Sequence, residues 1–321
     1  MRFNRFDLNL LIALDALLRE RNVTRAAERV YLSQPAMSSA LARLRDYFRD
    51  PLLVRVGRDL ELTPRGRTLM EPVRQMLLNA HAVLGSQALF DPSVDRRTFT
   101  LLSPECVTLW LIRSILRRLQ TWAPGIRIQV ERPSAPALAR LSQGNVDLLM
   151  AMDGPDSLPV TAVPEALCSA FVSAVRYVGV VAADHPEVAD QLTSELFLRL
   201  PHIVVRTFRP TSLVEETVKK RFGVELDVRA VTDSVLEVPH LVAGTSLIGV
   251  VPKQLAHVLE GTPDIKVMEL PDGVMPVSRL DMLWHRSYEP DAGHVWMRGV
   301  VLNQSAGQLR PVSTGMSSVP A

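Results

Sequence analysis

The first thirty residues carry two apolar stripes at helical spacing. Residues 7–21 place a leucine every three or four positions, which predicts a helix that ends near Asn22. Thr24 then stands where an N-cap is needed, so a short second helix is predicted over residues 25–30. The side chains expected to be buried by these helices are Leu10, Leu14, Leu17, Leu18, Ala26, Ala27 and Val30.

A third helix is predicted to begin directly after Ser33, whose hydroxyl can cap it. Pro35 falls in its first turn, where the missing N–H of proline costs no hydrogen bond. The positions expected to face the core are Met37, Ala40, Leu41, Leu44 and Phe48. The opposite face is mostly small and polar and carries Gln34, Ser38, Ala42 and Arg45.

Residues 52–62 alternate in character and turn at residues 57–59, which predicts a β-hairpin. Thr63 and Pro64 then begin a long helix that is predicted to run to about Leu89. Its narrow apolar seam consists of Leu69, Val73, Met76, Ala80, Val83 and Leu84. Such a seam on a helix between domains is typical of a coiled-coil dimer contact, and the alternative is that the helix packs on its own domain.

After Pro92 the pattern changes to strand-like runs that alternate with helical ones. The predicted strands are residues 98–103, 126–130, 146–150, 177–182, 203–206, 226–231, 247–251, 265–270 and 278–284. The predicted helices are residues 107–122, 135–143, 211–222, 235–243, 253–259 and a last helix after Asp291. This alternation indicates an α/β fold with parallel sheets that are covered on both faces.

The composition excludes several classes of protein. The 321 residues are 47% hydrophobic and 22% charged, which is ordinary for a globular protein and excludes a disordered chain. No apolar run reaches the ~18 residues of a membrane span, and no signal-peptide cleavage site follows Leu18, so neither membrane insertion nor secretion is expected. The only two cysteines, Cys106 and Cys168, favour a cytoplasmic protein over a disulfide framework.

The net charge of +2 hides an asymmetry along the chain. Residues 1–66 contain twelve arginines, no lysine and eight acidic residues, a net charge of +4 that leaves −2 for the rest. A small basic head on a slightly acidic body is expected of a chain whose one end binds nucleic acid.

Residues 23–44 combine a short helix, a tight turn and a capped second helix, the arrangement of a helix-turn-helix unit. Gln34 can pair with adenine through two hydrogen bonds, and Ser38 can reach a base or a phosphate. Small exposed side chains let such a helix approach base edges in the major groove. The alternative is a plain three-helix bundle, in which these exposed residues have no role.

A resemblance to LysR-type transcriptional regulators is carried by the segment FDLNLLIALDALLRERNVTRAAERVYLSQPAMSSALARLRDYFRDPLLVRVGRDLELTPRG. It contains the family's alanine pair, its Ser-Gln-Pro-Ala turn into the recognition helix, and Thr-Pro at the head of the linker helix. The similarity is nearest to the branch of salicylate-responsive and nodulation activators, as indicated by FDLNLL, FDPSVDRRTF, ADHP and WHRSYEPDAGHVWMR.

The resemblance implies three folded parts and a tail. An all-α winged helix-turn-helix domain is expected over residues 1–63, followed by a dimerising linker helix over residues 64–90. An effector domain similar to periplasmic binding proteins is expected over residues 94–303, and a Ser-, Gly- and Pro-rich disordered tail over residues 304–321. Within the effector domain, subdomain I is expected at about residues 94–171 and 271–303, and subdomain II at about residues 172–270.

The resemblance also assigns the DNA contacts. Gln34, Pro35 and Ser38 match base-edge positions of the family, and Ser33 and Ser39 beside them complete the predicted recognition set. Phosphate contacts are expected from Arg43 and the wing residue Arg55, and, by charge and place alone, from Arg25 and Arg58. The partner expected from this arrangement is double-stranded DNA with an inverted repeat. For each arginine the alternative is an ordinary solvated surface charge.

The family holds a small effector between its two subdomains, as pockets often lie at domain interfaces. The pocket edges expected from this are the residues that end or follow strands, namely Ser103, Ser134, Thr207, Phe208 and Thr232. Ser103 before a helix start favours an anionic ligand, whereas Pro104 removes one donor and Glu105 adds a negative charge, so the ligand's charge stays open. The branch suggests an aromatic or heteroaromatic inducer, and no cofactor is expected.

The resemblance implies a homodimer or homotetramer that activates transcription through RNA polymerase. A repressor or a redox-responsive regulator of the same fold are open alternatives, although Cys106 at a helix start is expected to be a packed thiol. An enzyme is disfavoured because no nucleophile–base pair, phosphate loop or metal-ligand spacing is visible, and residues 244–249 fit a turn into a buried strand rather than a catalytic elbow. A solute-binding protein is disfavoured because no export signal is visible.

Overall fold

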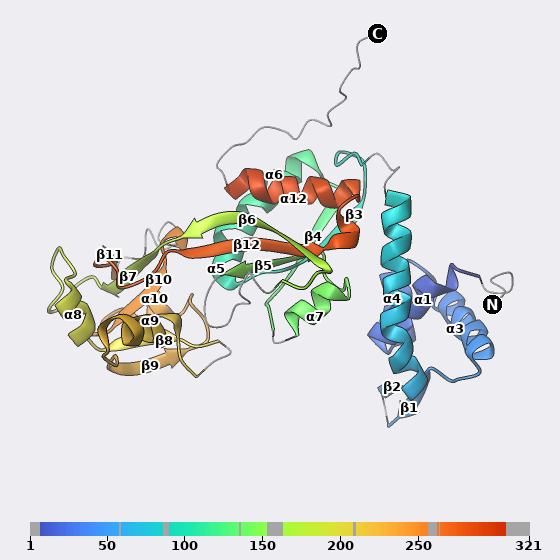
Figure 1. Cartoon of the computed structure of the whole chain (residues 1–321), viewed down its shortest axis with the longest axis horizontal. Coiled ribbons are helices and arrows are strands. Elements are labelled where there is room, and N and C mark those ends of the chain that lie inside the picture. Colours follow the sequence, from blue (N-terminus) through green and yellow to red (C-terminus); the bar gives the residue numbers. More distant parts are fainter. Residues whose placement is uncertain are drawn as a thin grey trace, which may run out of the picture. The chain divides into compact units, whose positions relative to one another are not determined.

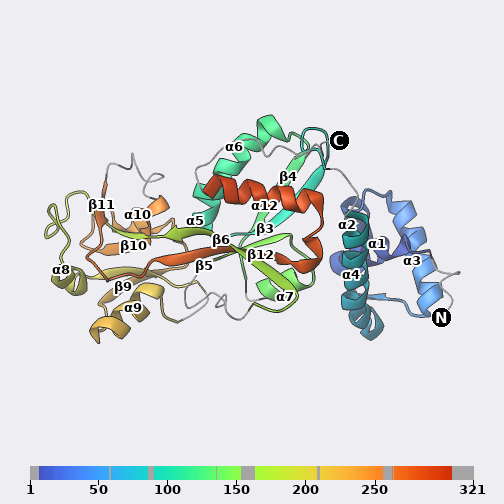
Figure 2. The same cartoon turned by 45° about the horizontal axis from the view of Figure 1, so that its top comes forward.

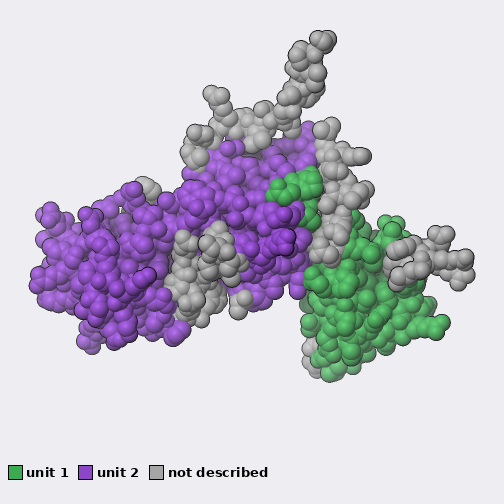
Figure 3. Space-filling view, in the orientation of Figure 1, with its two compact units in different colours: residues 1–88, 287–291 green, residues 89–286, 292–321 purple. Residues whose placement is uncertain are grey.

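The computed structural model describes residues 7–57, 59–85, 90–134, 136–152, 163–207, 210–255, 262 and 264–305. The chain divides into two compact units, which Figure 3 colours separately. Unit 1 comprises residues 1–88 with 287–291, and unit 2 comprises residues 89–286 with 292–321. Among the described residues, no helix is long and apolar enough to cross a membrane.

Unit 1 contains the predicted helices and hairpin (Figure 1). Its elements are α1 (Leu10–Glu20), α2 (Val23–Arg29), α3 (Gln34–Phe48), β1 (Leu53–Val56), β2 (Asp59–Leu62) and α4 (Pro64–Gly85). The predicted stripes of α1, α2 and α3 meet in one apolar core, in which Leu14, Ala26 and Met37 are fully buried. Val30 and Phe48 are only partly buried against this core.

The predicted cap of α2 is wrong by two residues. The side-chain oxygen of Asn22, not Thr24, accepts the hydrogen bond at the helix start, from the backbone N–H of Arg25 at 3.0 Å. Helix α1 ends at Arg21 in the left-handed region with φ of 45°, which leaves Asn22 as the one extended residue between the two helices. Asn22 therefore occupies the N-cap position, where a short polar side chain is most favourable.

The predicted hairpin of the wing is confirmed, and the predicted long helix is present as α4 as far as Gly85; its predicted end near Leu89 lies outside the described residues. Strands β1 and β2 pair antiparallel, with Leu53 opposite Leu62, and Gly57 adopts a φ of 64° in the turn. On α4, Val73 is buried in the core of unit 1 and Leu69 packs against that core, so this part of the seam serves its own domain. Met76 and Ala80 are exposed, and the side chains of Val83 and Leu84 lie outside the described residues.

Unit 2 contains two five-stranded sheets. Sheet I has the order β4-β3-β5-β12-β6 and sheet II the order β11-β7-β10-β8-β9. The strands of sheet I are β3 (Arg97–Leu102), β4 (Ile126–Glu131), β5 (Leu148–Met152), β6 (Leu167–Val175) and β12 (Ser278–His285). The strands of sheet II are β7 (Tyr177–Ala182), β8 (His202–Val205), β9 (Val228–Thr232), β10 (Ile248–Pro252) and β11 (Ile265–Glu269).

The expectation of parallel sheets is only half right. Strands β3, β4 and β5 are parallel to one another, as are β8, β9 and β10. Strand β12 runs antiparallel to both β5 and β6, and β7 runs antiparallel to β10 and β11. The antiparallel strands are those at which the chain passes from one sheet to the other. Strand β6 continues to Val175 and β7 begins at Tyr177, so the first passage is at Arg176 rather than between residues 171 and 172.

Helices cover both faces of each sheet (Figures 1 and 2). In sheet I, α6 (Arg113–Trp122) and α12 (Ala292–Ser305) lie on one face and α7 (Ala137–Ser142) on the other. In sheet II, Val181 and Val204 pack toward α8 (Ser194–Arg199) and α9 (Leu213–Phe222), whereas Val180 and Ile203 pack toward α10 (Val238–Val242). This alternation follows from the two-residue period of a strand.

The predicted helix over residues 107–122 is one helical run that begins earlier, at Glu105. It consists of α5 (Glu105–Val107), a π-helical turn η2 (Thr108–Ile112) and α6. Strand β6 and helix α8 were not predicted. Of the predicted helix 253–259 the structure describes residues 253–255, and the predicted tail lies outside the described residues from residue 306 onward.

Candidate nucleic-acid interface and effector site

The N-terminus of α3 is presented as the sequence predicts. Ser33 has an extended backbone, and its hydroxyl oxygen accepts a hydrogen bond from the Ala36 N–H at 3.3 Å. Gln34 and Pro35 therefore form the first helical turn, and both are exposed. Ser38 and Ser39 are exposed on the next turn, while the buried Met37 anchors this end of the helix in the core. All five predicted recognition residues thus share one accessible end of α3.

The predicted phosphate-binding arginines are exposed but already engaged in local contacts. Arg43 lies 3.1 Å from the Asp7 carboxylate, and Arg25 donates to the Glu20 carbonyl oxygen at 3.0 Å. Arg55 donates to the Gly57 carbonyl oxygen at 3.2 Å, at the tip of the wing. Exposed pairs of this kind contribute little stability, so a phosphate can replace the present partners at low cost. Arg58 lies outside the described residues.

Arg45, which the sequence places on the same face as Gln34, has a structural contact instead. Its guanidinium donates to the carbonyl oxygens of Pro51 at 2.9 Å and Leu53 at 3.1 Å. These contacts tie α3 to the first strand of the wing. Because a planar guanidinium can hold two carbonyl oxygens at once, Arg45 fixes the position of the wing relative to α3.

An open groove of about 780 Å³ lies between the start of α2 and the wing. It brings together two of the predicted phosphate contacts, Arg25 and Arg55. Two further arginines that the sequence pattern does not single out, Arg19 and Arg21, also line it. The remaining lining residues are Glu20, Asn22, Val23, Thr24, Leu60 and Glu61.

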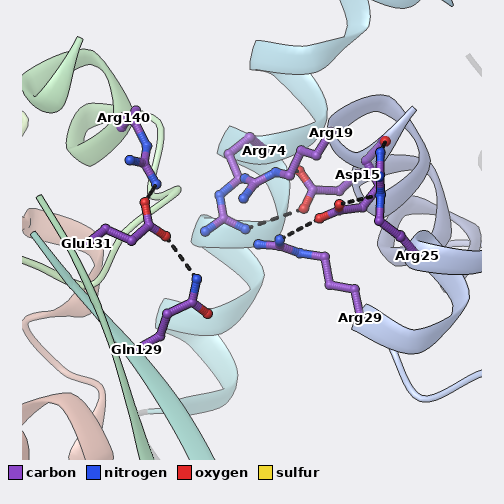
Figure 4. A network of polar contacts seen from close by, with 9 residues as sticks. Asp15, Arg19, Arg25, Arg29, Arg74, Gln129, Glu131 and Arg140 are labelled. Carbon is purple, nitrogen blue, oxygen red and sulfur yellow. Dashed lines mark hydrogen bonds and ion pairs between the residues drawn. The ribbon is translucent and has the colours of Figure 1, made fainter. Parts of the chain in front are cut away.

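A network of ion pairs joins α1 to α4 in the same unit (Figure 4). The Asp15 carboxylate forms one ion pair with Arg19 at 3.0 Å and another with Arg74 at 3.6 Å. Burial and the neighbouring Arg74 charge lower the pKa of Arg19 to about 10, and Asp15 opposes this change. One carboxylate therefore balances two guanidinium groups at the joint between the head and the linker helix. The i,i+4 spacing of Asp15 and Arg19 is a sequence signal that could have revealed half of this network.

The predicted effector contacts differ in their burial and in their hydrogen bonds. Ser103 is buried, its N–H donates to the Glu131 carbonyl oxygen at 2.9 Å, and its hydroxyl donates to the Pro104 carbonyl oxygen at 3.3 Å. Ser134 and Thr207 are exposed, and Phe208 lies outside the described residues.

Thr232 is the last residue of β9 and is buried. Its hydroxyl donates to the Glu237 carboxylate and accepts a hydrogen bond from the Ser234 N–H at 3.1 Å. The Thr232 proton is therefore committed to a neighbour within subdomain II.

A contact that the sequence could not predict connects the two subdomains of unit 2. The Ser234 hydroxyl donates to Oε2 of Glu105 at 2.8 Å, although the two residues are 129 positions apart. Glu105 begins the helix that follows β3, and Ser234 follows β9 of the other sheet. Arg132, directly after β4, forms an ion pair with Oε1 of the same carboxylate.

Cys106 is a packed thiol, as expected. It is buried, and its Sγ lies 3.7 Å from the Met152 sulfur. Burial raises the pKa of Cys106 to about 11, which suppresses the reactive thiolate. Neither Cys106 nor Cys168 is in a disulfide bond, and among the described residues no group of three or more His, Cys, Asp or Glu side chains could hold a metal ion.

A winged helix-turn-helix unit joined to a two-sheet α/β domain defines a ligand-responsive transcriptional regulator. Residues 8–67 match the bacterial regulatory helix-turn-helix proteins of the lysR family, and residues 93–306 match the LysR substrate binding domain. The chain belongs to the LysR family. It is therefore a DNA-binding transcriptional regulator and not an enzyme.

Relatives and solved structures agree with this assignment. Nodulation protein D of Bradyrhizobium sp. (strain ANU 289) is 33% identical over 95% of this chain and 88% of its own length, which confirms the similarity to the nodulation branch. The crystal structure of the probable transcriptional regulator PA0477 from Pseudomonas aeruginosa covers 93% of this chain and 97% of its own, with a TM-score of 0.74 and 28% identity. Full-length CbnR complexed with its target DNA shares the fold, with a TM-score of 0.57 and 15% identity over 94% of this chain and 100% of its own.

Proposed function

We propose that this LysR-type regulator binds an inverted-repeat operator through the exposed end of α3 and that a small effector between its subdomains switches it to activate transcription. The observation that carries the DNA contact is the cluster of Ser33, Gln34, Pro35, Ser38 and Ser39 on one accessible helix end. Short polar side chains there allow the helix to enter the major groove closely enough for hydrogen bonds to base edges.

The surrounding arginines supply the part of the affinity that does not depend on sequence. Arg25 and Arg55 line one groove between α2 and the wing, and Arg43 lies on α3 itself. We expect each of them to contact a phosphate, with Arg58 as a fourth contact. Phosphate contacts of this kind position a protein on the duplex and make its affinity depend on salt.

The exposed part of α4 supports a symmetric assembly. Met76 is 44% exposed and Ala80 is also exposed, on the helix whose first half packs on its own domain. A second copy that pairs along this surface would present two α3 helices to two half-sites about one helical turn apart, or a multiple of it. We propose a homodimer built through α4, which pairs into a homotetramer.

The effector side rests on the two-sheet domain that the family uses for substrate binding. We propose that an aromatic or heteroaromatic inducer enters between sheets I and II, near Ser103 and Thr232, with Ser134 and Thr207 at the rim, and that Phe208 also contacts it. Its binding would favour one arrangement of the subdomains and so change the bending of the operator. The regulator would then recruit RNA polymerase to the promoter. We propose that the protein acts in the cytoplasm.

Selection from a pool of random DNA duplexes tests the DNA contact and requires no operator sequence at the outset. The wild-type chain should enrich an inverted repeat, and a Gln34→Ala, Ser38→Ala double variant should lose that enrichment while keeping its oligomeric state in sedimentation. Thr121→Ala, which changes an exposed hydroxyl on α6, is the matched control and should select the same repeat as the wild type. Enrichment of an identical repeat by the double variant would refute the role of α3.

A further inference from the structure

The carboxylate of Glu105 takes part in one of the side-chain hydrogen bonds that join the two subdomains of unit 2; in another, the Tyr177 hydroxyl donates to the Ser278 hydroxyl at 2.9 Å. Ser234 of subdomain II donates its hydroxyl to Oε2 at 2.8 Å. The Glu105 side chain is only 13% exposed and the whole of Ser234 only 8%, so this bond is largely shielded from water. A hydrogen bond to a charged group is stronger than one between neutral groups, and shielding strengthens it further.

Two further acidic residues are close to Ser234 in the sequence. Asp233 and Glu237 are in the same loop as Ser234, and Glu237 accepts the Thr232 hydroxyl. Arg132 is the cation in contact with Glu105, and its side chain is 70% exposed. A guanidinium with so much access to water neutralises Glu105 only in part. A ligand that arrives with its own carboxylate is therefore repelled at this position.

Ser103, two residues before Glu105 in the sequence, does not offset this repulsion. Its N–H donates to the Glu131 carbonyl oxygen, and its hydroxyl donates to the Pro104 carbonyl oxygen. The donors that an anionic ligand would need at Ser103 are therefore committed within subdomain I. Glu105 itself supplies the negative charge at the place where an anionic ligand would have to bind.

We propose that Glu105 belongs to the effector site and that its carboxylate joins the two subdomains through Ser234. An effector binds there by replacing the Ser234 hydroxyl with a hydroxyl or amino donor of its own. Carboxylate effectors are excluded, because Glu105 occupies their position. This inference rests on the proposed effector site and names the chemical class of its ligand.

Removal of the carboxylate gives a test that does not require the natural effector. Glu105→Ala deletes a CH₂–COO⁻ group, which corresponds in size and charge to acetate. In the full-length chain this variant should melt about 4 °C below the wild type, because the bond between subdomains is lost. Sodium acetate should restore about half of that loss relative to sodium chloride at equal ionic strength, and it should leave the wild type unchanged.

Two further variants separate the contact from general effects of acetate. Ser234→Ala removes the donor but keeps the carboxylate, so it should lower the melting temperature by a similar amount without any response to acetate. Glu131→Gln is the matched control, because Glu131 pairs with Arg140 at 2.7 Å and with Gln129 at 2.9 Å inside subdomain I (Figure 4). This variant should show no acetate response.

The inference is overturned if folded Glu105→Ala fails to gain stability from acetate, or if the wild type gains as much as the variant does. Should Glu105→Ala not fold, an equal melting temperature for Ser234→Ala and wild type would overturn it instead. These results are independent of DNA binding, since a failed DNA selection with a positive acetate response would reject the proposed function alone. A successful selection with no acetate response would reject only the role of Glu105.

Discussion

The guanidinium of Arg74 on α4 lies 3.6 Å from the carboxylate of Asp15 on α1. This ion pair connects the linker helix to the helix-turn-helix core, and Arg19 shares the same carboxylate. Little water reaches the site, because the side chains of Asp15 and Arg74 are only 13% and 17% exposed. The orientation of α4 on the head is thus fixed by charge as well as by the packing of Val73.

Asp15→Asn should destabilise unit 1 strongly, because it leaves the guanidinium groups of Arg19 and Arg74 close together without their shared carboxylate. The expected loss in the free energy of unfolding is about 3 kcal/mol, measured by urea denaturation. Glu20→Gln is the control, since its partners Arg25 and Arg29 are largely exposed, and it should cost less than about 1 kcal/mol. Equal losses in the two variants would contradict this account of the joint.

The cap of α2 can be tested by a pair of alanine substitutions. Asn22→Ala removes the acceptor for the Arg25 N–H and should lower the free energy of unfolding by about 1 kcal/mol. Thr24→Ala changes an exposed residue inside the first turn and should cost less than about 0.5 kcal/mol. Thermal denaturation of the two variants under the same conditions gives the comparison. A larger loss of stability in Thr24→Ala than in Asn22→Ala would show that Thr24 is the cap instead.

His202 should make sheet II sensitive to acid. It is 1% exposed and packs edge-on against Phe197, and burial lowers its pKa from 6.5 to about 4. A histidine with a depressed pKa in the folded state stabilises the fold above its unfolded pKa and loses that contribution as pH falls toward its folded pKa. Between pH 7 and pH 5 the loss should be about 2 kcal/mol.

Denaturation of the wild type and of His202→Phe at both pH values measures this effect. Phenylalanine keeps an aromatic ring in the core but cannot be protonated, so the variant should show a much smaller difference between the two pH values. The same acid sensitivity in both proteins would assign the effect to other groups. The absolute stability of the variant is not part of the comparison, because only the change with pH is used.

Cys106 should be almost inert toward thiol reagents in the folded protein. A pKa of about 11 leaves a thiolate fraction at pH 8 that is roughly a hundredfold below that of an ordinary cysteine. Cys168 on β6 is less buried and should react first. Mass spectrometry of the labelled chain distinguishes the two sites, and Cys106→Ser should leave the fast phase unchanged. Fast labelling at Cys106 would contradict this prediction and favour a redox-responsive regulator.

The head could be predicted from the sequence because its elements depend on local pattern. The buried stripe of α3, its Ser33 cap and the Gly57 turn are each determined within a few residues. Asn22 and Thr24 are both good capping residues, and only the end of α1 at Arg21 decides between them. For the recognition set, the accessible end of α3 is placed as expected, whereas its contacts with DNA stay a prediction.

The effector domain was less predictable, because its decisive features depend on distant residues. Strand β6, with the sequence LCSAFVSAV, has small residues and weak alternation, so it does not stand out until it pairs with β12. Strand direction in the two sheets depends on where the chain passes between them. The Glu105–Ser234 bond joins residues that are 129 positions apart, and no local pattern indicates it.

The position of β12 between β5 and β6 has a consequence for synthesis on the ribosome. Residues 278–285 fill the middle of a sheet whose other strands end by residue 175. The nascent chain therefore exposes two unpaired strand edges, those of β5 and β6, while residues 176–277 emerge, and such edges readily pair with strands of other chains. A polypeptide that is released before residue 278 has been added keeps both edges exposed and is prone to aggregation. The sheet is protected from such pairing only near the end of translation.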